Sequence, residues 1–294
     1  MKPGVVSKQS INGNVVLERK MLGMHHILSL DTKLCVGCDI CSIICPQKTL
    51  TQSIPTVKEG RLVQKSIPSL EAQSCTFCGE CVVLCPSNAI EIDVNGKPTV
   101  RVAEANVFPT LVKTIEVDIG KCDPACNLVC QDKCPTKAVD VKVETEKDSG
   151  KKTIKEVLVD RKLCIFCRQC ELACPSNAIK VTKPFAGLIK LDPELCPDGC
   201  QVCLDSCPSK AITLDKNSKP IIDEEFCIYC GACKLVCPKN AISYERTSVL
   251  CTDVTSGAWI EALEKLASKR SLIKKLRSKG QKRLREATQG MNRF

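Results

Sequence analysis

Short runs in which apolar and polar residues alternate recur along most of this 294-residue chain. Residues 89–94 read AIEIDV, residues 138–143 read AVDVKV and residues 178–182 read AIKVT, and similar runs follow at 211–214 and 241–244. A period of two is the pattern of a strand with one buried face. We therefore expect a short β-strand, entered through an alanine, at each of these places.

Further apolar runs precede a cysteine and end in an acidic residue, as in TIEVDIGKC at 114–122, VLVDRKLC at 157–164, LIKLDPELC at 188–196 and PIIDEEFC at 220–227. Turn signals such as NGKP at 95–98 stand between paired runs. The repeating unit is thus a strand, a cysteine loop, a short helical turn and a second strand. This pattern predicts an α+β fold.

The pattern changes near the C-terminus, where apolar residues recur at helical spacing and most intervening residues are Lys or Arg. The apolar positions are Trp259, Leu263, Leu266, Leu272, Ile273 and Leu276. Of the 43 basic and 33 acidic residues in the chain, 11 and 3 lie between Trp259 and the end. We expect a basic helical tail whose apolar face docks onto a partner subunit. A membrane-surface helix is one alternative, and nucleic-acid binding is a less favoured one.

Cysteine is unusually frequent, with 25 residues, whereas aromatic residues make up only 3% of the chain. Chains this rich in cysteine are either secreted disulfide scaffolds or intracellular metal proteins. The first 26 residues lack the apolar segment of a signal peptide, and no run of about 18 apolar residues occurs. We therefore expect a cytoplasmic metal-binding protein without a transmembrane segment.

Six cysteine motifs account for 24 of the 25 cysteines. Four of them follow C-x2-C-x2-C-x3-C-P, the spacing of bacterial ferredoxins, in which three cysteines ligate one [4Fe–4S] cluster and the fourth ligates the other cluster of a pair. Each expected ligand set takes the name of its first cysteine. The six sets are Cys35, Cys38, Cys41 and Cys85; Cys75, Cys78, Cys81 and Cys45; Cys122, Cys126, Cys130 and Cys174; Cys164, Cys167, Cys170 and Cys134; Cys196, Cys200, Cys203 and Cys237; and Cys227, Cys230, Cys233 and Cys207. The remaining cysteine, Cys251, is expected to be a free, buried thiol.

The spacing between motifs suggests three two-cluster domains. The expected organisation is an N-terminal extension at 1–27, ferredoxin domains at 28–100, 119–184 and 185–250, a connector at 101–118 and the basic helical tail at 251–294. The 21 residues between Cys174 and Cys196 also allow the fourth motif to pair with the fifth.

Other metal sites explain the spacing less well. Structural zinc prefers two CxxC pairs on separate loops, and disulfides need an oxidising compartment. Cys196, Cys200 and Cys203 have the spacing of radical S-adenosylmethionine enzymes, but a fourth cysteine and Pro208 follow at ferredoxin spacing.

Two motifs depart from the ferredoxin spacing. The third has an extra residue in each of its first two gaps, and the fifth has one in its first gap. Either the loop bulges and keeps four ligands, which we favour, or the altered loop gives its cluster a different potential. A redox titration that resolves the clusters distinguishes these two interpretations.

No histidine adjoins a cysteine motif, and the chain contains no Gly-rich phosphate loop or nucleophile elbow. With every iron ligated by protein, outer-sphere electron transfer is the expected chemistry, so the chain is interpreted as a non-catalytic electron carrier without a small-molecule substrate.

Residues 30–245 resemble archaeal polyferredoxins. Within that group the resemblance is strongest to the polyferredoxins of formylmethanofuran dehydrogenase, through NGKP after the second motif, the Phe108-Pro109 connector before IEVDIGKC, and CIYCGACKLVCPKNAI followed by an Arg-containing strand and SGAW. Those relatives carry eight motifs and this chain has six. The resemblance implies electron exchange with a tungsten or molybdenum subunit of an oxidoreductase complex in methanogenesis, and with ferredoxin or heterodisulfide reductase. A polyferredoxin of a nickel–iron or energy-converting hydrogenase is the alternative.

Overall fold

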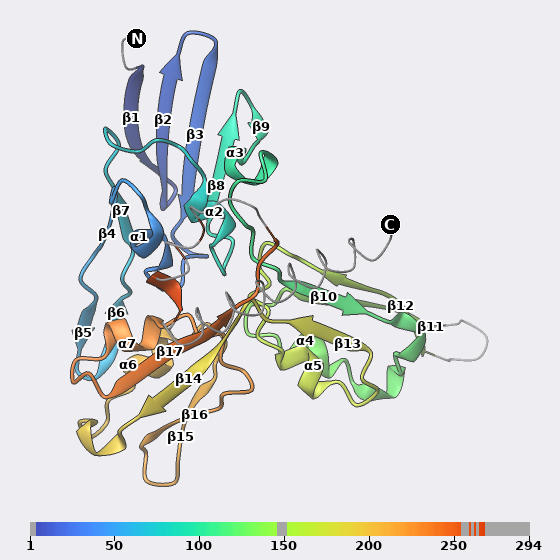
Figure 1. Ribbon diagram of the computed structural model, residues 1–294. Helices are drawn as coiled ribbons and strands as arrows, with labels where there is room; N and C mark the ends of the chain where they lie inside the picture. The colour runs from blue at the N-terminus through green and yellow to red at the C-terminus, as the bar shows by residue number, and fades with distance from the viewer. Residues whose placement is uncertain (1–3, 146–151, 254–258, 260–261, 263–264, 268–294) are drawn as a thin grey trace, which may run out of the picture.

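The computed structural model describes residues 4–145, 152–253, 259, 262 and 265–267. Figure 1 shows three lobes that meet near the centre of the molecule. Each lobe carries two consecutive cysteine motifs. The α+β class is confirmed, because short strands alternate with helices of four or five residues in the described chain.

The first lobe is built on an antiparallel sheet with the strand order β1-β2-β3-β8-β9. Its elements are β1 (Val5–Ile11), β2 (Asn14–Met21), β3 (Met24–Asp31), α1 (Ile40–Ile44), β4 (Leu50–Gln52), β5 (Thr56–Lys58), β6 (Arg61–Gln64), β7 (Pro68–Leu70), α2 (Glu80–Val83), β8 (Ile90–Val94) and β9 (Lys97–Pro98). The N-terminal residues expected as an extension therefore contribute β1 and β2 to the sheet of this lobe.

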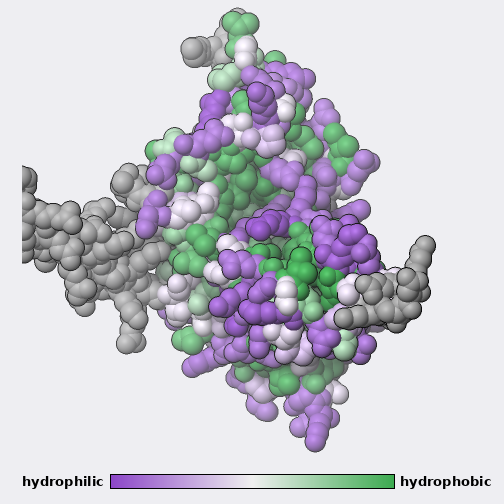
Figure 2. All heavy atoms as spheres, turned by 90° about the vertical axis from the view of Figure 1, so that its right-hand side faces the viewer, coloured by the Kyte–Doolittle hydropathy of each residue, from purple (hydrophilic) through white to green (hydrophobic). Residues whose placement is uncertain are grey.

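The second lobe follows α3 (Arg101–Glu104), which lies in the expected connector. Its elements are β10 (Thr114–Val117), η1 (Ile119–Lys121), η2 (Pro124–Cys126), α4 (Val129–Asp132), β11 (Val139–Thr145), β12 (Lys152–Val159), α5 (Gln169–Ala173) and β13 (Ile179–Thr182). Figure 2 turns this side of the molecule toward the viewer and shows hydrophobic residues interspersed with hydrophilic ones. Exposed apolar side chains in the lobe include Ile119, Leu158 and Leu172.

The third lobe packs below the first in Figure 1. Its elements are β14 (Phe185–Leu191), η3 (Pro193–Leu195), α6 (Val202–Ser206), β15 (Ile212–Leu214), β16 (Pro220–Ile222), α7 (Ala232–Val236) and β17 (Ile242–Val249). An ion pair joins it to β6 of the first lobe, with Arg61 Nη2 and Asp205 Oδ1 2.7 Å apart. The third lobe is thus fixed to the first by polar contacts as well as by packing.

The strands of each lobe pair in a nested order. The strand before its first motif pairs with the strand after its second motif, in the pairs β3–β8, β10–β13 and β14–β17. Inside this outer pair, β4 pairs with β7, β11 with β12 and β15 with β16. The fourth motif is thereby joined to the third rather than to the fifth.

One apolar core spans all three lobes. It includes Ile40 and Leu84 from the first lobe, Ile165 from the second, and Phe185 and Ile228 from the third. Two smaller cores lie within the first and second lobes. Because the cores are assembled mainly from aliphatic residues and cysteines, the chain needs few aromatic residues.

The start of the C-terminal tail belongs to the shared core. Trp259 and Leu266 are each only 4% exposed, and the Trp259 ring stands edge-on to Phe108 with 5.6 Å between the ring centroids. The expectation that these two side chains dock onto a partner is therefore wrong, because the chain itself covers them. Leu263, Leu272, Ile273 and Leu276 lie outside the described residues.

Cys251 is half-buried and forms an isolated antiparallel bridge with Leu111. Within the described part of the chain, no helix has both the length and the apolar character needed to cross a membrane.

We predict that Trp259→Ala lowers the free energy of unfolding by about 3 kcal/mol, because a buried indole is removed from a packed core. The measurement is chemical unfolding of the anaerobically purified chain. Leu188→Ala is the control, since Leu188 is 55% exposed and should change stability little. Equal effects of the two substitutions would contradict the packing of Trp259.

Candidate iron–sulfur cluster sites

The motif cysteines interact across motifs in the crossed order expected from the sequence. Burial raises the pKa of the Cys35 thiol, and the charge of Cys85 raises it further. In each of the other sets the fourth cysteine also acts on a thiol of the neighbouring motif. These electrostatic pairs are Cys45 with Cys75, Cys174 with Cys122, Cys134 with Cys167, Cys237 with Cys196, and Cys207 with Cys230. The fourth cysteine of each motif therefore faces the partner motif.

Four of the expected ligand sets each surround a cavity. The Cys35, Cys75, Cys196 and Cys227 sets each line a small cavity between the two motifs of their lobe. The remaining walls are mainly apolar, as with Leu30, Ile40 and Ile90 beside the Cys35 set. Four thiols around an apolar space fit the donor set of a [4Fe–4S] cluster. The residues present are therefore suited to this group.

Several of these thiols are deeply buried. Burial, the largest cause, raises the pKa of Cys167 to about 11 and that of Cys230 to about 12. Such thiols would lose the proton on binding a metal, so metal binding at these sites would release protons.

The loop around the second cysteine has left-handed backbone on one or both sides in all six motifs. The φ angles are +73° at Gly37 and +63° at Asp39, +55° at Phe77 and +90° at Gly79, +53° at Asn127, +56° at Phe166 and +70° at Arg168, +73° at Gly199, and +48° at Tyr229 and +86° at Gly231. Left-handed residues next to right-handed ones turn successive N–H groups toward one side and form anion-binding concavities, including Fe–S sites. Gly231 is required, because a Cβ there would lie 2.3 Å from Cζ of Tyr244.

The three aromatic residues before a second cysteine, Phe77, Phe166 and Tyr229, are all buried. We expect from the sequence that they pack around clusters rather than relay electrons. Phe77 lines the cavity of the Cys75 set and Tyr229 lines that of the Cys227 set. Their place in the cavity walls is consistent with a packing role.

A backbone N–H group donates to the sulfur of the fourth cysteine in five motifs. The donor is always the alanine four residues later, with N to Sγ distances of 3.3 Å for Ala89, Ala178, Ala211 and Ala241 and 3.2 Å for Ala138. In the first motif Thr49 stands at this position, and its hydroxyl lies 3.3 Å from Cys45 Sγ. The alanines were visible in the sequence as the entry to each strand, but their role as donors depends on the turn geometry.

Cations reach the carbonyl groups of motif cysteines from distant parts of the chain. Arg19 donates to Cys75 O at 2.6 Å, Lys219 to Cys196 O at 3.1 Å, Lys183 to Cys227 O at 2.9 Å and Lys113 to Cys85 O at 2.9 Å, and Lys65 donates to Cys35 O. Sequence reasoning missed these residues, because nothing in their local sequence shows which loop they contact.

Arg246 is the most enclosed of the cations, with 4% exposure. Its Nε donates to Tyr229 O at 2.9 Å and its Nη2 to Cys230 O at 2.7 Å. The guanidinium lies between the rings of Phe185 and Tyr244, 5.3 and 5.1 Å from their centroids. It therefore fixes the loop that carries the second cysteine of the sixth motif.

Three of the six sets meet where the lobes meet. The Cys38 thiol of the first lobe interacts electrostatically with Cys230 of the third. Lys113 interacts with both Cys85 and Cys164, so it links the Cys35 and Cys164 sets. Lys183 interacts with Cys227 and with Cys167, so it links the Cys227 and Cys164 sets. One set from each lobe is thus turned toward the centre.

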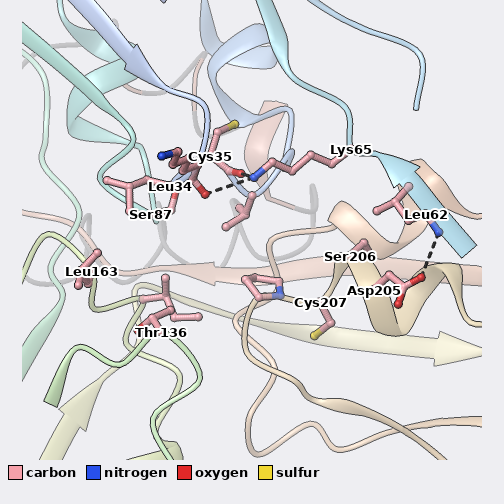
Figure 3. A pocket seen from close by; sticks show the side chains of 14 residues that line it. Leu34, Cys35, Leu62, Lys65, Ser87, Thr136, Leu163, Asp205, Ser206 and Cys207 are labelled. Carbon is pink, nitrogen blue, oxygen red and sulfur yellow. Dashed lines mark hydrogen bonds between the residues drawn. The ribbon is translucent and has the colours of Figure 1, made fainter. Parts of the chain in front are cut away.

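A pocket of about 350 Å³ opens at this meeting point (Figure 3). Cys35 and Ser87 line it from the first lobe, Thr136 and Leu163 from the second, and Cys207 from the third. The backbone N–H of Leu62 donates to Asp205 Oδ2 at 3.0 Å across this region. The pocket therefore borders members or neighbours of all three central sets.

Comparison with protein families matches residues 34–89 and 195–241 to a 4Fe–4S dicluster domain and residues 157–180 to a 4Fe–4S binding domain. The matched stretches are thus 4Fe–4S ferredoxin-like domains in tandem, which confirms the predicted fold class. A chain of the formate dehydrogenase–heterodisulfide reductase–formylmethanofuran dehydrogenase complex from Methanospirillum hungatei has a similar structure, with a TM-score of 0.78 and 29% identity. That match covers 91% of this chain and 92% of the other.

Two relatives match shorter stretches. The polyferredoxin-like subunit of aliphatic sulfonate oxidoreductase from Pyrococcus furiosus is 31% identical over 115 residues, which are 34% of this chain and 65% of the relative. Formate hydrogenlyase subunit 2 from Escherichia coli is 30% identical over 102 residues, 32% of this chain and 50% of the relative. The chain spans less than two thirds of the length of these curated relatives.

We predict that Cys85→Ala alters the same cluster signal as Cys38→Ala, although Cys85 belongs to the second motif. Cys81→Ala, a change within that same motif, should alter a different signal. Electron paramagnetic resonance of the reduced protein, together with iron analysis, measures this. If Cys85→Ala and Cys81→Ala alter one and the same signal, the crossed ligand assignment is wrong.

We predict that Arg246→Lys lowers the free energy of unfolding by about 2 kcal/mol, because an ammonium cannot reproduce the two buried donors of the guanidinium. Thermal unfolding of the anaerobically purified chain provides the measurement. The exposed Arg161 supplies the matched control, Arg161→Lys, which should leave stability unchanged.

Proposed function

We propose that this chain is a non-catalytic electron-transfer subunit that holds six [4Fe–4S] clusters on the 24 motif cysteines and serves a larger oxidoreductase complex. The observation that carries the proposal is the crossed facing of the cysteine motifs: in four of the sets, three cysteines of one motif and the fourth cysteine of its neighbour line one cavity. A [4Fe–4S] cluster held by four thiolates accepts and releases single electrons without binding a substrate.

The residues of the chain supply the surroundings that such electron transfer needs. Burial of cysteines such as Cys38 and Cys230 excludes water from the sites. The alanine N–H groups and the cations beside the loops stabilise negative charge on the sulfur ligands, which is one determinant of potential. Because these groups are fixed by the fold, little reorganisation accompanies a change in charge.

The proposed electron path has three branches. The Cys35, Cys164 and Cys227 sets face one another at the centre, and the Cys75, Cys122 and Cys196 sets are their partners within the three lobes. Electrons that enter at one lobe would thus have access to either of the others. This arrangement suits a protein that connects more than two redox partners.

For the partner, we infer the catalytic subunits of a formylmethanofuran dehydrogenase, with heterodisulfide reductase as a second electron partner. The support is the likeness to the Methanospirillum hungatei complex, which extends over nine tenths of both chains. The relation to formate hydrogenlyase subunit 2 favours a hydrogen-linked complex as the alternative.

Purification of the native complex under anaerobic conditions tests the proposal. We expect about 24 iron atoms per chain and a co-purifying tungsten or molybdenum subunit. A hydrogenase large subunit in its place would overturn the partner assignment, and an iron content well below this value would overturn the cluster assignment.

A further inference from the structure

Two lysines lie between cysteine sets of different lobes. Lys113 stands just before β10, and its Nζ donates to Cys85 O of the first lobe at 2.9 Å and contacts Asn88 Oδ1. The same Nζ lies 5.7 Å from the centroid of the Phe166 ring, beside the Cys164 set. One ammonium group therefore lies beside both the Cys35 set and the Cys164 set, although the whole third motif separates Cys85 from Cys164 in the sequence.

Lys183 lies at the boundary between the second and third lobes. It follows β13, and its Nζ donates to Cys227 O at 2.9 Å and to Glu225 O at 2.7 Å. The Nζ lies 5.9 Å from the centroid of the Tyr229 ring, which belongs to the same motif as Cys227. Toward the second lobe, Glu225 Oε2 lies 3.5 Å from Nη1 of Arg168, the residue after Cys167, and Lys183 also interacts electrostatically with Cys167.

The other lysines that reach cysteine carbonyls act within a single lobe. Lys65 contacts Cys35 O of its own lobe, and Lys219 contacts Cys196 O of its own lobe. Each of these cations is placed to compensate the negative charge of one cysteine set. A charge located between two sets, by contrast, acts on both of them.

The physical effect of such a cation follows from Coulomb interactions in a medium of low dielectric constant. A ligand set with its cluster is anionic, and an added electron makes it more so. A nearby positive charge lowers the free energy of the reduced state, and the effect is largest where water is excluded. A cation between two sets stabilises the reduced state of both.

We propose that Lys113 and Lys183 are positioning residues that raise the potentials of the sets on both sides of each lobe boundary and thereby keep the two inter-lobe electron steps close in potential. Lys113 serves the Cys35 and Cys164 sets, and Lys183 serves the Cys164 and Cys227 sets. This inference rests on the proposed cluster assignment.

The experiment compares Lys113→Gln and Lys183→Gln with the wild-type full-length chain in cluster-resolved redox titrations followed by electron paramagnetic resonance. Each variant should move two of the six signals to more negative potential. One signal, that of the Cys164 set, should move in both variants, and the other moved signal should differ between them. Loss of a positive charge elsewhere in the chain would not make one signal move in both variants and a second signal move in only one of them.

Lys162→Gln is the matched control. Lys162 also lies at the boundary between the first and second lobes, where its Nζ is 2.7 Å from Glu91 Oε1, but its side chain is 51% exposed. This substitution removes the same charge and should move no signal. Lys113→Arg keeps the charge and should leave the potentials near those of the wild type.

The outcomes separate the inference from the proposed function. A wild-type chain with fewer than six clusters overturns the cluster assignment itself. Six clusters whose potentials do not change in either glutamine variant, or that change equally in Lys113→Arg, overturn the role of the lysines.

Asn88→Asp is a second probe should a glutamine variant lose its clusters. It places a carboxylate on the same Lys113 ammonium and should move the same two signals to more negative potential. The thermal midpoint of each variant is measured in parallel, because a purely structural role would lower that midpoint without selecting two signals. Unchanged potentials in Asn88→Asp would equally overturn the inference.

Discussion

The exchange of a cysteine between two motifs is the constraint on which this structure depends. A motif whose fourth cysteine faces the neighbouring motif cannot complete its own set, so both motifs must be held at a fixed separation and orientation. The nested strand pairs of each lobe do this, with β3–β8, β10–β13 and β14–β17 as the outer pairs. Because metal ligands, loops and strands are complete only together, we expect each lobe to fold and bind its clusters as a unit.

A second consequence of this exchange is that cysteines able to carry negative charge are gathered in the interior. Thiolates that are buried in an apolar core are costly unless charge and hydrogen bonds compensate them. The chain provides this compensation at several levels: left-handed loop residues, alanine N–H groups such as that of Ala89, and cations such as Arg246 on loop carbonyls. These cations are among the 43 basic residues of the chain and are placed to compensate the candidate cluster sites.

The proposal of a branched electron carrier is based on the place where the three lobes meet. The shared core around Phe185 and Ile228 brings one set of each lobe toward the centre, and Trp259 of the tail packs on Phe108 in the same core. The tail thus helps to hold the junction together. Since the similar chain from the Methanospirillum hungatei complex matches over 91% of this one, the likeness includes the arrangement of all three lobes.

The sequence by itself determined the repeat and the α+β class and predicted the crossed order of the cysteines, because each depends on local spacing: C-x2-C-x2-C-x3-C-P, a period of two in the strands, and alanine before the strand that follows five of the six motifs. It left open whether the fourth motif joins the third or the fifth, since both gaps are long enough. It also led to a wrong expectation for Trp259, because helical periodicity shows that a face is apolar and not what covers it. The order of the lobes, the central position of the Cys35, Cys164 and Cys227 sets and the contacts of Lys113 and Lys183 were decided only by the tertiary structure. These features depend on long-range packing between segments that share no local pattern, and a lysine in a loop has the same local sequence signature whether it lies in solvent or between two cysteine sets.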